Sequence, residues 1–221
     1  MILSNSKHKL FSFILVALLG LNLTATAGTI KTDLLVVGGS ASGVAASIQA
    51  SKMGINTTLI EESTWLGGML TSAGVSAIDG NYNLRAGFWG EFLDSLVVHY
   101  GSLKALKTGW VSNVLFEPSV GDKIFKSICQ KEQNLKIYYE YYPISIKRNS
   151  MGEWVLQASS NKKEPLTIVA KCVIDATELD DVAKMAGVKY DKGMEAKSFT
   201  SEDIAPKEVY GIIQDLPMLP H

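Results

Sequence analysis

One turn in the sequence has the residue types and spacing needed to hold a diphosphate: Gly38-Gly39-Ser40-Ala41-Ser42-Gly43. A β-branched apolar run precedes this turn and a predicted helix follows it, so the unpaired N–H groups and the positive end of the helix dipole face it. Gly38 permits the tight turn, and Gly43 permits close packing of the helix against the strand. We therefore predict that an anion such as a pyrophosphate binds at this turn.

One position of the turn departs from the usual pattern of three glycines. Ser40 stands where the middle glycine lets the backbone approach the phosphate, and we expect its hydroxyl to donate to the phosphate instead. Ser42 is expected to do the same or to cap the helix. The competing hypothesis is a glycine-rich turn between a strand and a helix that binds no ligand.

A carboxylate follows the turn at the position expected for ribose recognition. Glu61 ends the next predicted strand, about 20 residues after the turn, where such an acid accepts hydrogen bonds from a ribose diol. Glu62 is a second choice for the same role. No acidic residue lies between Gly38 and Lys52, so this segment carries no charge that repels an anion.

The elements that must position these residues follow from the pattern of apolar residues. A strand, a helix and a second strand form a βαβ unit of about 30 residues. Later segments read as helices, a hairpin around residues 149–152, and further strands. The predicted strands are residues 33–37, 56–60, 137–142, 144–147, 154–158, 166–170 and 172–175, and the predicted helices are residues 43–53, 88–100 and one that begins at Pro118. This order predicts an α/β, Rossmann-like domain with a parallel sheet, flanking helices and an inserted antiparallel β-meander.

Composition limits the classes of function. The chain has 221 residues, is 47% hydrophobic and 19% charged, and has a formal net charge of −1. Without clusters of Lys and Arg it is not expected to bind nucleic acid. Cys129 and Cys172 are expected to be two buried thiols, although an exported protein is able to pair them.

The N-terminus has the pattern of a secretory signal peptide. Lys7, His8 and Lys9 precede an apolar stretch over residues 10–23, and Ala25-Thr26-Ala27 forms a cleavage site before Gly28. We expect residues 1–27 to be removed and the mature protein to be periplasmic or secreted, with no stable membrane anchor. The alternative is an uncleaved anchor, which the short apolar stretch disfavours.

Several motifs in order resemble one family of proteins. They are residues 33–46, 59–61, 66–69, 116–118 and 174–177. Together they resemble the FAD-dependent oxidoreductases that share the two-dinucleotide-binding-domain flavoprotein fold. The resemblance implies an FAD/NAD(P)-binding domain over residues 28–197 with FAD as cofactor, and the start of a truncated C-terminal region over residues 198–221.

The resemblance also assigns roles to residues. The turn from Gly38 to Gly43 would hold the FAD pyrophosphate, and Glu61, or less readily Glu62, the adenosine ribose. The remaining assigned residues are Leu66, Gly67, Gly68 and Met69 along the flavin, Ala176 and Thr177 near the pyrophosphate, and Pro143 near the adenine. The competing interpretation of the glycine pair Gly67-Gly68, and of the strand-end turn at Ala176-Thr177, is an ordinary turn that binds no cofactor. Pro143 has no N–H to offer the adenine.

No catalytic residue is identified from the sequence. The candidates Asp79, Asn81 and Arg85 lie in the polar loop after the glycine pair, where surface positions are the competing interpretation. No Cys-x-x-Cys pair, metal-ligand spacing or Gly-x-Ser-x-Gly motif is present. The sequence thus predicts an exported flavin enzyme acting on a small molecule; the alternatives are an NAD-binding oxidoreductase and a non-catalytic or truncated exported scaffold.

Overall fold

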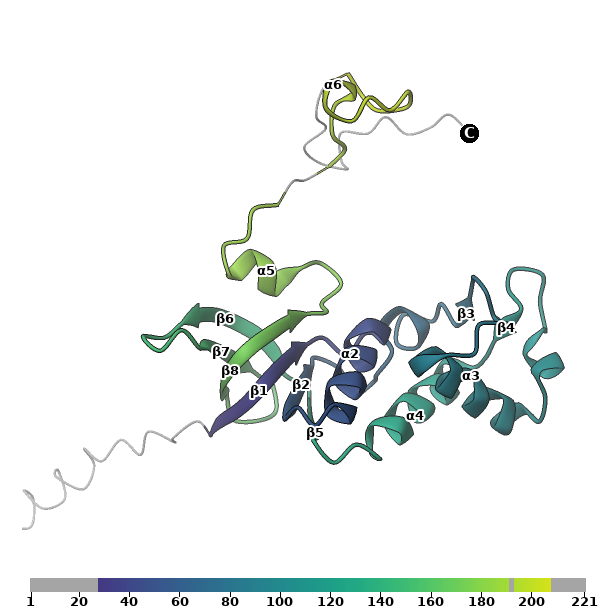
Figure 1. Ribbon diagram of the computed structural model, residues 1–221, viewed down its shortest axis with the longest axis horizontal. Coiled ribbons are helices and arrows are strands. Elements are labelled where there is room, and N and C mark those ends of the chain that lie inside the picture. The colour runs from purple at the N-terminus through teal and green to yellow at the C-terminus, as the bar shows by residue number, and fades with distance from the viewer. Residues whose placement is uncertain (1–27, 191–192, 208–221) are drawn as a thin grey trace, which may run out of the picture.

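The computed structural model describes residues 28–190 and 193–207 (Figure 1). The predicted signal peptide and the last part of the predicted C-terminal region lie outside these residues. No helix of the described part is long and apolar enough to cross a membrane.

A six-stranded sheet forms the centre of the fold, with the strand order β5-β2-β1-β8-β7-β6. The strands are β1 (Thr29–Val37), β2 (Thr57–Glu61), β5 (Leu135–Tyr139), β6 (Tyr142–Arg148), β7 (Trp154–Ser159) and β8 (Leu166–Asp175). Strands β5, β2, β1 and β8 run parallel, whereas β6, β7 and β8 form an antiparallel meander. The predicted α/β fold is therefore confirmed.

Two stretches differ from the strand prediction. Residues 137–142 were expected to form one strand, but β5 ends at Tyr139 and β6 begins at Tyr142, with Glu140 at a φ of +66° between them. Residues 166–170 and 172–175 were expected to be two strands, but β8 is continuous through Lys171. The Lys171 ammonium forms an ion pair of 2.6 Å with Asp33 on the neighbouring β1 and lowers the pKa of that carboxyl group. Lys171 interrupts the apolar pattern of the sequence, but its charge is paired with Asp33 at the surface of the sheet, so the strand continues through it.

Helices cover the sheet on both faces. The helices of the described residues are α2 (Ala41–Lys52), α3 (Gly87–Tyr100), α4 (Pro118–Cys129), α5 (Asp181–Met185) and α6 (Lys197–Thr200), with 3-10 turns η1 (Gly68–Leu70) and η2 (Leu103–Leu106); of these, α2 and α5 pack directly against the sheet, on opposite faces. Helix α2 packs against β1 and β2, and α3 and α4 pack beside it, whereas α5 lies against β6 (Figure 1). A small antiparallel sheet of β3 (Ala77–Ile78) and β4 (Val114–Leu115) lies near α3. The short helices α5 and α6 were not predicted.

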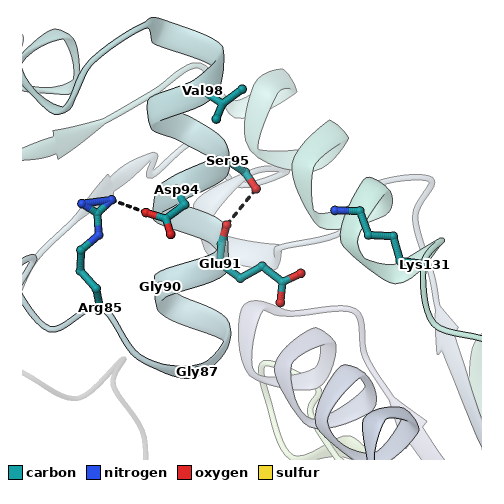
Figure 2. Close-up of a pocket in the computed structure, with 8 residues that line it drawn as sticks. All are labelled: Arg85, Gly87, Gly90, Glu91, Asp94, Ser95, Val98 and Lys131. Carbon is teal, nitrogen blue, oxygen red and sulfur yellow. Dashed lines mark hydrogen bonds and ion pairs between the residues drawn. The ribbon is translucent and has the colours of Figure 1, made fainter.

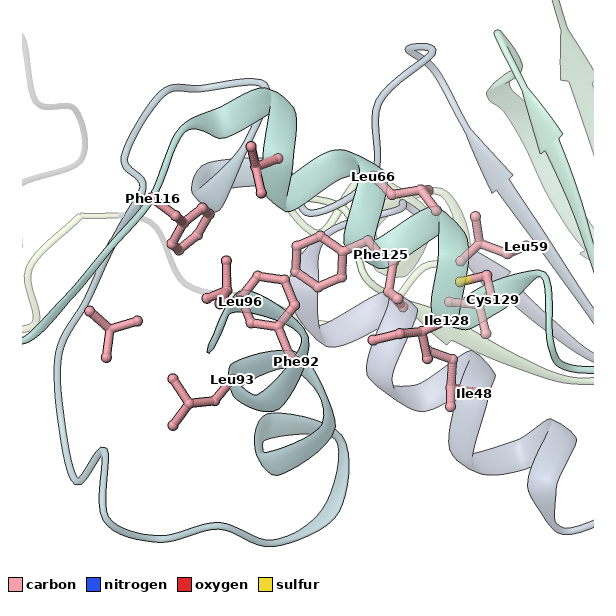
Figure 3. Close-up of a cluster of buried hydrophobic side chains, with 14 of the residues drawn as sticks. Ile48, Leu59, Leu66, Phe92, Leu93, Leu96, Phe116, Phe125, Ile128 and Cys129 are labelled. Carbon is pink, nitrogen blue, oxygen red and sulfur yellow. The ribbon is translucent and has the colours of Figure 1, made fainter. Parts of the chain in front are cut away.

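The larger core lies between the sheet and helices α2, α3 and α4 (Figure 3). Its centre is the stacked pair Phe92 and Phe125, whose ring centroids are 4.6 Å apart. Ile48 of α2, Leu59 of β2 and Ile128 of α4 complete the contact between layers. Burying each such side chain contributes about 1.5–3 kcal/mol, and this packing fixes where α2 begins relative to the sheet.

The two cysteines differ in burial. Cys129 is buried on α4, as predicted, and burial together with the Glu132 carboxylate raises the pKa of its thiol to about 12. Cys172 is exposed, so its prediction as a buried thiol was wrong. It pairs with Leu34 on the face of the sheet that α2 covers, but α2 packs against β1, β2 and β5 and leaves this part of β8 open.

Candidate functional site

A cleft of about 440 Å³ opens at the carboxyl ends of β1, β2 and β8. Ligands of open α/β sheets bind at such strand ends. Most of the cofactor-binding residues predicted from the sequence line this cleft: Gly38, Gly39, Ser40, Glu61, Glu62, Gly68, Met69, Pro143, Ala176 and Thr177. The fold therefore brings together segments that lie more than 100 residues apart in the sequence.

Two glycines of the turn are required by backbone packing. Gly38 has a φ of +101°, and a Cβ on it would lie 2.4 Å from the carbonyl oxygen of Ala176. A Cβ on Gly43 would lie 2.1 Å from the carbonyl oxygen of Gly38. Both distances are far below van der Waals contact, so the turn, the start of α2 and the end of β8 pack together only with glycine at these positions.

Ser40 is the residue that caps α2. Its Oγ accepts a hydrogen bond of 3.2 Å from the N–H of Gly43, and it lies 2.9 Å from the Oγ of Ser42. The helix cap considered for Ser42 is therefore made by Ser40. In the described part of the chain, the main-chain N–H groups of Ser40 and Ser42 have no hydrogen-bond acceptor, so both remain available to an anion.

Glu61 is held in place at the end of β2 by main-chain N–H groups. Its Oε2 accepts a hydrogen bond of 2.7 Å from Gly39, and its Oε1 accepts one of 2.8 Å from Ser63. A carboxylate has about four lone-pair sites, so each oxygen can still accept a hydrogen bond from a hydroxyl group. The neighbouring Glu62 is exposed and also lines the cleft.

The segment from Leu66 to Met69 forms a second wall. Leu66 is fully buried, and the Gly67 N–H donates to the Gly39 carbonyl at 2.7 Å, which ties this wall to the glycine turn. Gly67 has a φ of +110°, and a Cβ on it would lie 2.5 Å from the Phe125 ring. The exposed Met69 side chain lines the cleft.

A buried carboxylate that sequence reasoning missed positions this wall. Asp122 on α4 accepts a hydrogen bond of 2.8 Å from the Leu66 N–H and forms an ion pair of 2.7 Å with Lys126. The Lys126 ammonium also donates to the carbonyl of Thr64 at 2.6 Å. An acid three residues before Phe125, on the apolar face of the predicted helix, was the signal that could have identified it.

The turn after β8 forms the third wall. The Ala176 N–H donates to the Val37 carbonyl at 2.8 Å, which extends the pairing of β8 with β1 up to the glycine turn. Asp175 accepts from the N–H and the hydroxyl of Thr177 and from the N–H of Ala183. Asp175 therefore fixes both this turn and α5.

Several residues of the cleft carried no signal in the sequence. They come from strand ends, from the turn after η1 and from the segment that leads into and begins α5, and they are Val37, Ile60, Ser72, Ala73, Tyr141, Glu178, Leu179 and Asp181. The remaining predicted cofactor-binding residues are not part of this lining, and they are Ala41, Ser42, Gly43, Leu66 and Gly67. Of this second group, Gly43 and Gly67 act through the backbone contacts described above.

The catalytic candidates lie outside the cleft. Asp79 lines a separate hollow of about 210 Å³ with Lys107 and Trp110. Arg85 lines a shallow hollow of about 600 Å³ beside α3, where it forms an ion pair with Asp94 (Figure 2). That hollow is larger than the cleft but is wide open to solvent and shares no residue with it.

Asn81 stands apart from both hollows and accepts a hydrogen bond from the Asn83 N–H within its own loop. The structure therefore does not bring Asp79, Asn81 and Arg85 together, and no role follows from their placement. Within the described ranges, no group of three or more His, Cys, Asp or Glu residues is arranged to hold a metal ion.

The sequence matches the family described as FAD dependent oxidoreductase over residues 33–215. The chain belongs to this family. FAD is the family's cofactor, and the cleft fits it: the turn leaves main-chain N–H groups open at the start of α2, and Glu61 stands at the end of β2. Comparison with the curated proteins finds no significant match.

Two solved structures share the fold. A flavoprotein/dehydrogenase from Cytophaga hutchinsonii superposes with a TM-score of 0.51 at 18% identity, over 75% of this chain and 44% of that one. The structure named AlpK superposes with a TM-score of 0.51 at 14% identity, over 71% of this chain and 33% of that one. The chain thus spans less than half the length of either structure.

Proposed function

We propose that this chain binds FAD in the cleft and forms the FAD-binding part of an oxidoreductase that acts on a small molecule. The observation that carries the proposal is the convergence of the glycine turn, Glu61 and the wall at Gly68 and Met69 on one cleft. When bound, FAD supplies the redox chemistry, and the protein supplies position and electrostatics.

Each wall has a binding task in this proposal. The free N–H groups of Ser40 and Ser42 donate to the diphosphate, where the positive end of the α2 dipole adds to the attraction. The Glu61 carboxylate, held by Gly39 and Ser63, accepts hydrogen bonds from the adenosine ribose. Gly68 and Met69 line the continuation of the cleft, where the flavin side of the cofactor would lie.

The visible absorption spectrum of the purified chain tests the proposal. We expect flavin absorbance to remain with the protein after gel filtration, either as purified or after FAD is added. Glu61→Gln should bind FAD about tenfold more weakly, since a neutral amide accepts more weakly than a carboxylate. Glu91→Gln, which removes a charge that does not line the cleft, should bind like the wild type.

Calorimetric titrations of the chain with FAD and with NAD separate the alternatives. A colourless protein that does not bind added FAD contradicts the proposal. Binding of NAD without binding of FAD would instead support the nicotinamide alternative. Binding of neither dinucleotide would support a scaffold that keeps the fold without the cofactor.

We also propose that the protein is exported to the periplasm or secreted. The basic start, the apolar stretch over residues 10–23 and the site at Ala25-Thr26-Ala27 support this proposal. N-terminal sequencing of the protein from fractionated cells should give Gly28 as the first residue, outside the cytoplasm. A protein that starts at Met1 in the cytoplasm contradicts it.

A further inference from the structure

The Glu178 carboxylate lies beside the glycine turn. A Cβ placed on Gly68 would lie 2.8 Å from Glu178 Oε1 and 3.0 Å from Ser40 Cα. Glu178 and Ser40 therefore border the same small space beside Gly68, and all three residues line the cleft. Ser40 is also one of the two residues of the turn whose main-chain N–H has no acceptor within the described ranges.

No positive side chain offsets this carboxylate. The charged residues that line the cleft are Glu61, Glu62, Glu178 and Asp181, and no Lys, Arg or His is among the described residues that do so. Glu61 differs from Glu178 because both of its oxygens accept main-chain N–H groups. The Glu178 side chain has no ion pair or hydrogen bond within the described ranges.

The charge therefore acts on whatever anion the turn holds. A diphosphate carries two negative charges, and like charges a few ångströms apart repel unless a counter-charge or solvent screens them. Because Glu178 is exposed, water and salt reduce the repulsion without removing it.

We propose that Glu178 opposes diphosphate binding and thereby sets how tightly the cleft holds a dinucleotide. This inference rests on the proposed function, since it assigns the diphosphate to the glycine turn. Glu178 is in this account an affinity-determining residue of the cofactor cleft. Its charge has a measurable signature that a purely structural residue lacks, namely an effect that depends on salt and on the phosphate groups of the ligand.

The test is calorimetric titration of the full chain and of its Glu178→Gln variant in buffer that contains EDTA, so that no divalent cation masks the charge. At low salt, Glu178→Gln should bind FAD about tenfold more tightly than the wild type. In 0.5 M NaCl the gain should fall below about threefold. Riboflavin, which has no phosphate, should bind both proteins equally.

Asp180→Asn is the matched control. Asp180 is exposed, lies two residues from Glu178, does not line the cleft and has a φ of +53°, which Asn tolerates. This variant removes the same charge and should change FAD affinity less than about twofold. Thermal unfolding of all three proteins verifies that they are folded.

Inorganic pyrophosphate serves as a second probe that does not depend on FAD. If neither protein binds FAD but Glu178→Gln binds pyrophosphate more tightly, the proposed function fails and the inference about Glu178 stands. If Glu178→Gln binds FAD and pyrophosphate no more tightly than the wild type, or if neither protein binds either probe, the inference is overturned.

Discussion

The glycines of the cleft and the glycines of the polar loop meet different physical demands. A Cβ on Gly38, Gly43 or Gly67 would collide with backbone or ring atoms at 2.1–2.5 Å. Gly74 and Gly80 also have positive φ, yet nothing lies within 4 Å of a Cβ placed on them. The first group is required because neighbouring backbone (at Gly38 and Gly43) or a packed ring (at Gly67) lies against the glycine, and the second only because the chain turns. Close backbone approach therefore marks the cleft, and glycine content alone does not.

Gly43→Ala should cause the largest loss of stability among substitutions that test this comparison. Its Cβ would lie 2.1 Å from the Gly38 carbonyl oxygen, so we expect a loss of more than about 3 kcal/mol of stability or a failure to fold. Gly80→Ala should cost only about 1–2 kcal/mol, from backbone strain alone. Urea unfolding of both variants measures the difference. Equal losses would mean that the backbone contact is not what requires glycine at residue 43.

Asp122→Ala should cause the next largest loss of stability, because Asp122 holds the cleft wall that begins at Leu66. It leaves the buried N–H of Leu66 without an acceptor and removes the ion pair of Lys126, which keeps only the Thr64 carbonyl. The loss should cost about 2–3 kcal/mol. Breaking the exposed pair of Lys52 and Glu91 with Glu91→Gln should cost less than about 0.5 kcal/mol. Thermal unfolding compares the two variants, and a similar small cost for both would contradict the positioning role of Asp122 at the Leu66–Met69 wall.

Alkaline pH should lower the free energy of unfolding through the buried thiol of Cys129 on α4. Its thiol has a pKa of about 12 when folded and an ordinary value of 9.0, so above pH 9 the unfolded chain loses a proton that the folded chain keeps. Stability that is present below pH 9 is then lost as the pH rises, by about 1 kcal/mol between pH 9 and pH 10. Cys129→Ala should lose correspondingly less over this interval in urea unfolding. Parallel losses in the two proteins would show that Cys129 does not titrate abnormally.

The features that were predictable from the sequence depend on short stretches of chain. The βαβ unit and the glycine turn were visible because apolar runs and glycines act locally. Asp122 was missed because its partner, Leu66, is 56 residues away. Cys172 was placed wrongly because its exposure depends on which strands α2 covers, and the continuity of β8 depended on Asp33 of another strand.

The polar loop shows where prediction from residue types alone fails. Asp79, Asn81 and Arg85 have residue types suited to chemistry, but composition does not say toward which hollow a loop residue points. Arg85 finds its partner, Asp94, on α3 instead of facing the cleft. Contacts between distant segments decide such positions, and no local pattern records them.

The most direct test of the central claim is an NMR titration of the ¹⁵N-labelled chain with FAD, in which each main-chain N–H is observed separately. If the glycine turn holds the diphosphate, the largest changes will occur at the N–H groups of Ser40 and Ser42, while those of Gly80 and Asn81 stay unchanged. If FAD instead shifts the signals around Arg85 and Asp94, or leaves those of the turn unmoved, the account is contradicted.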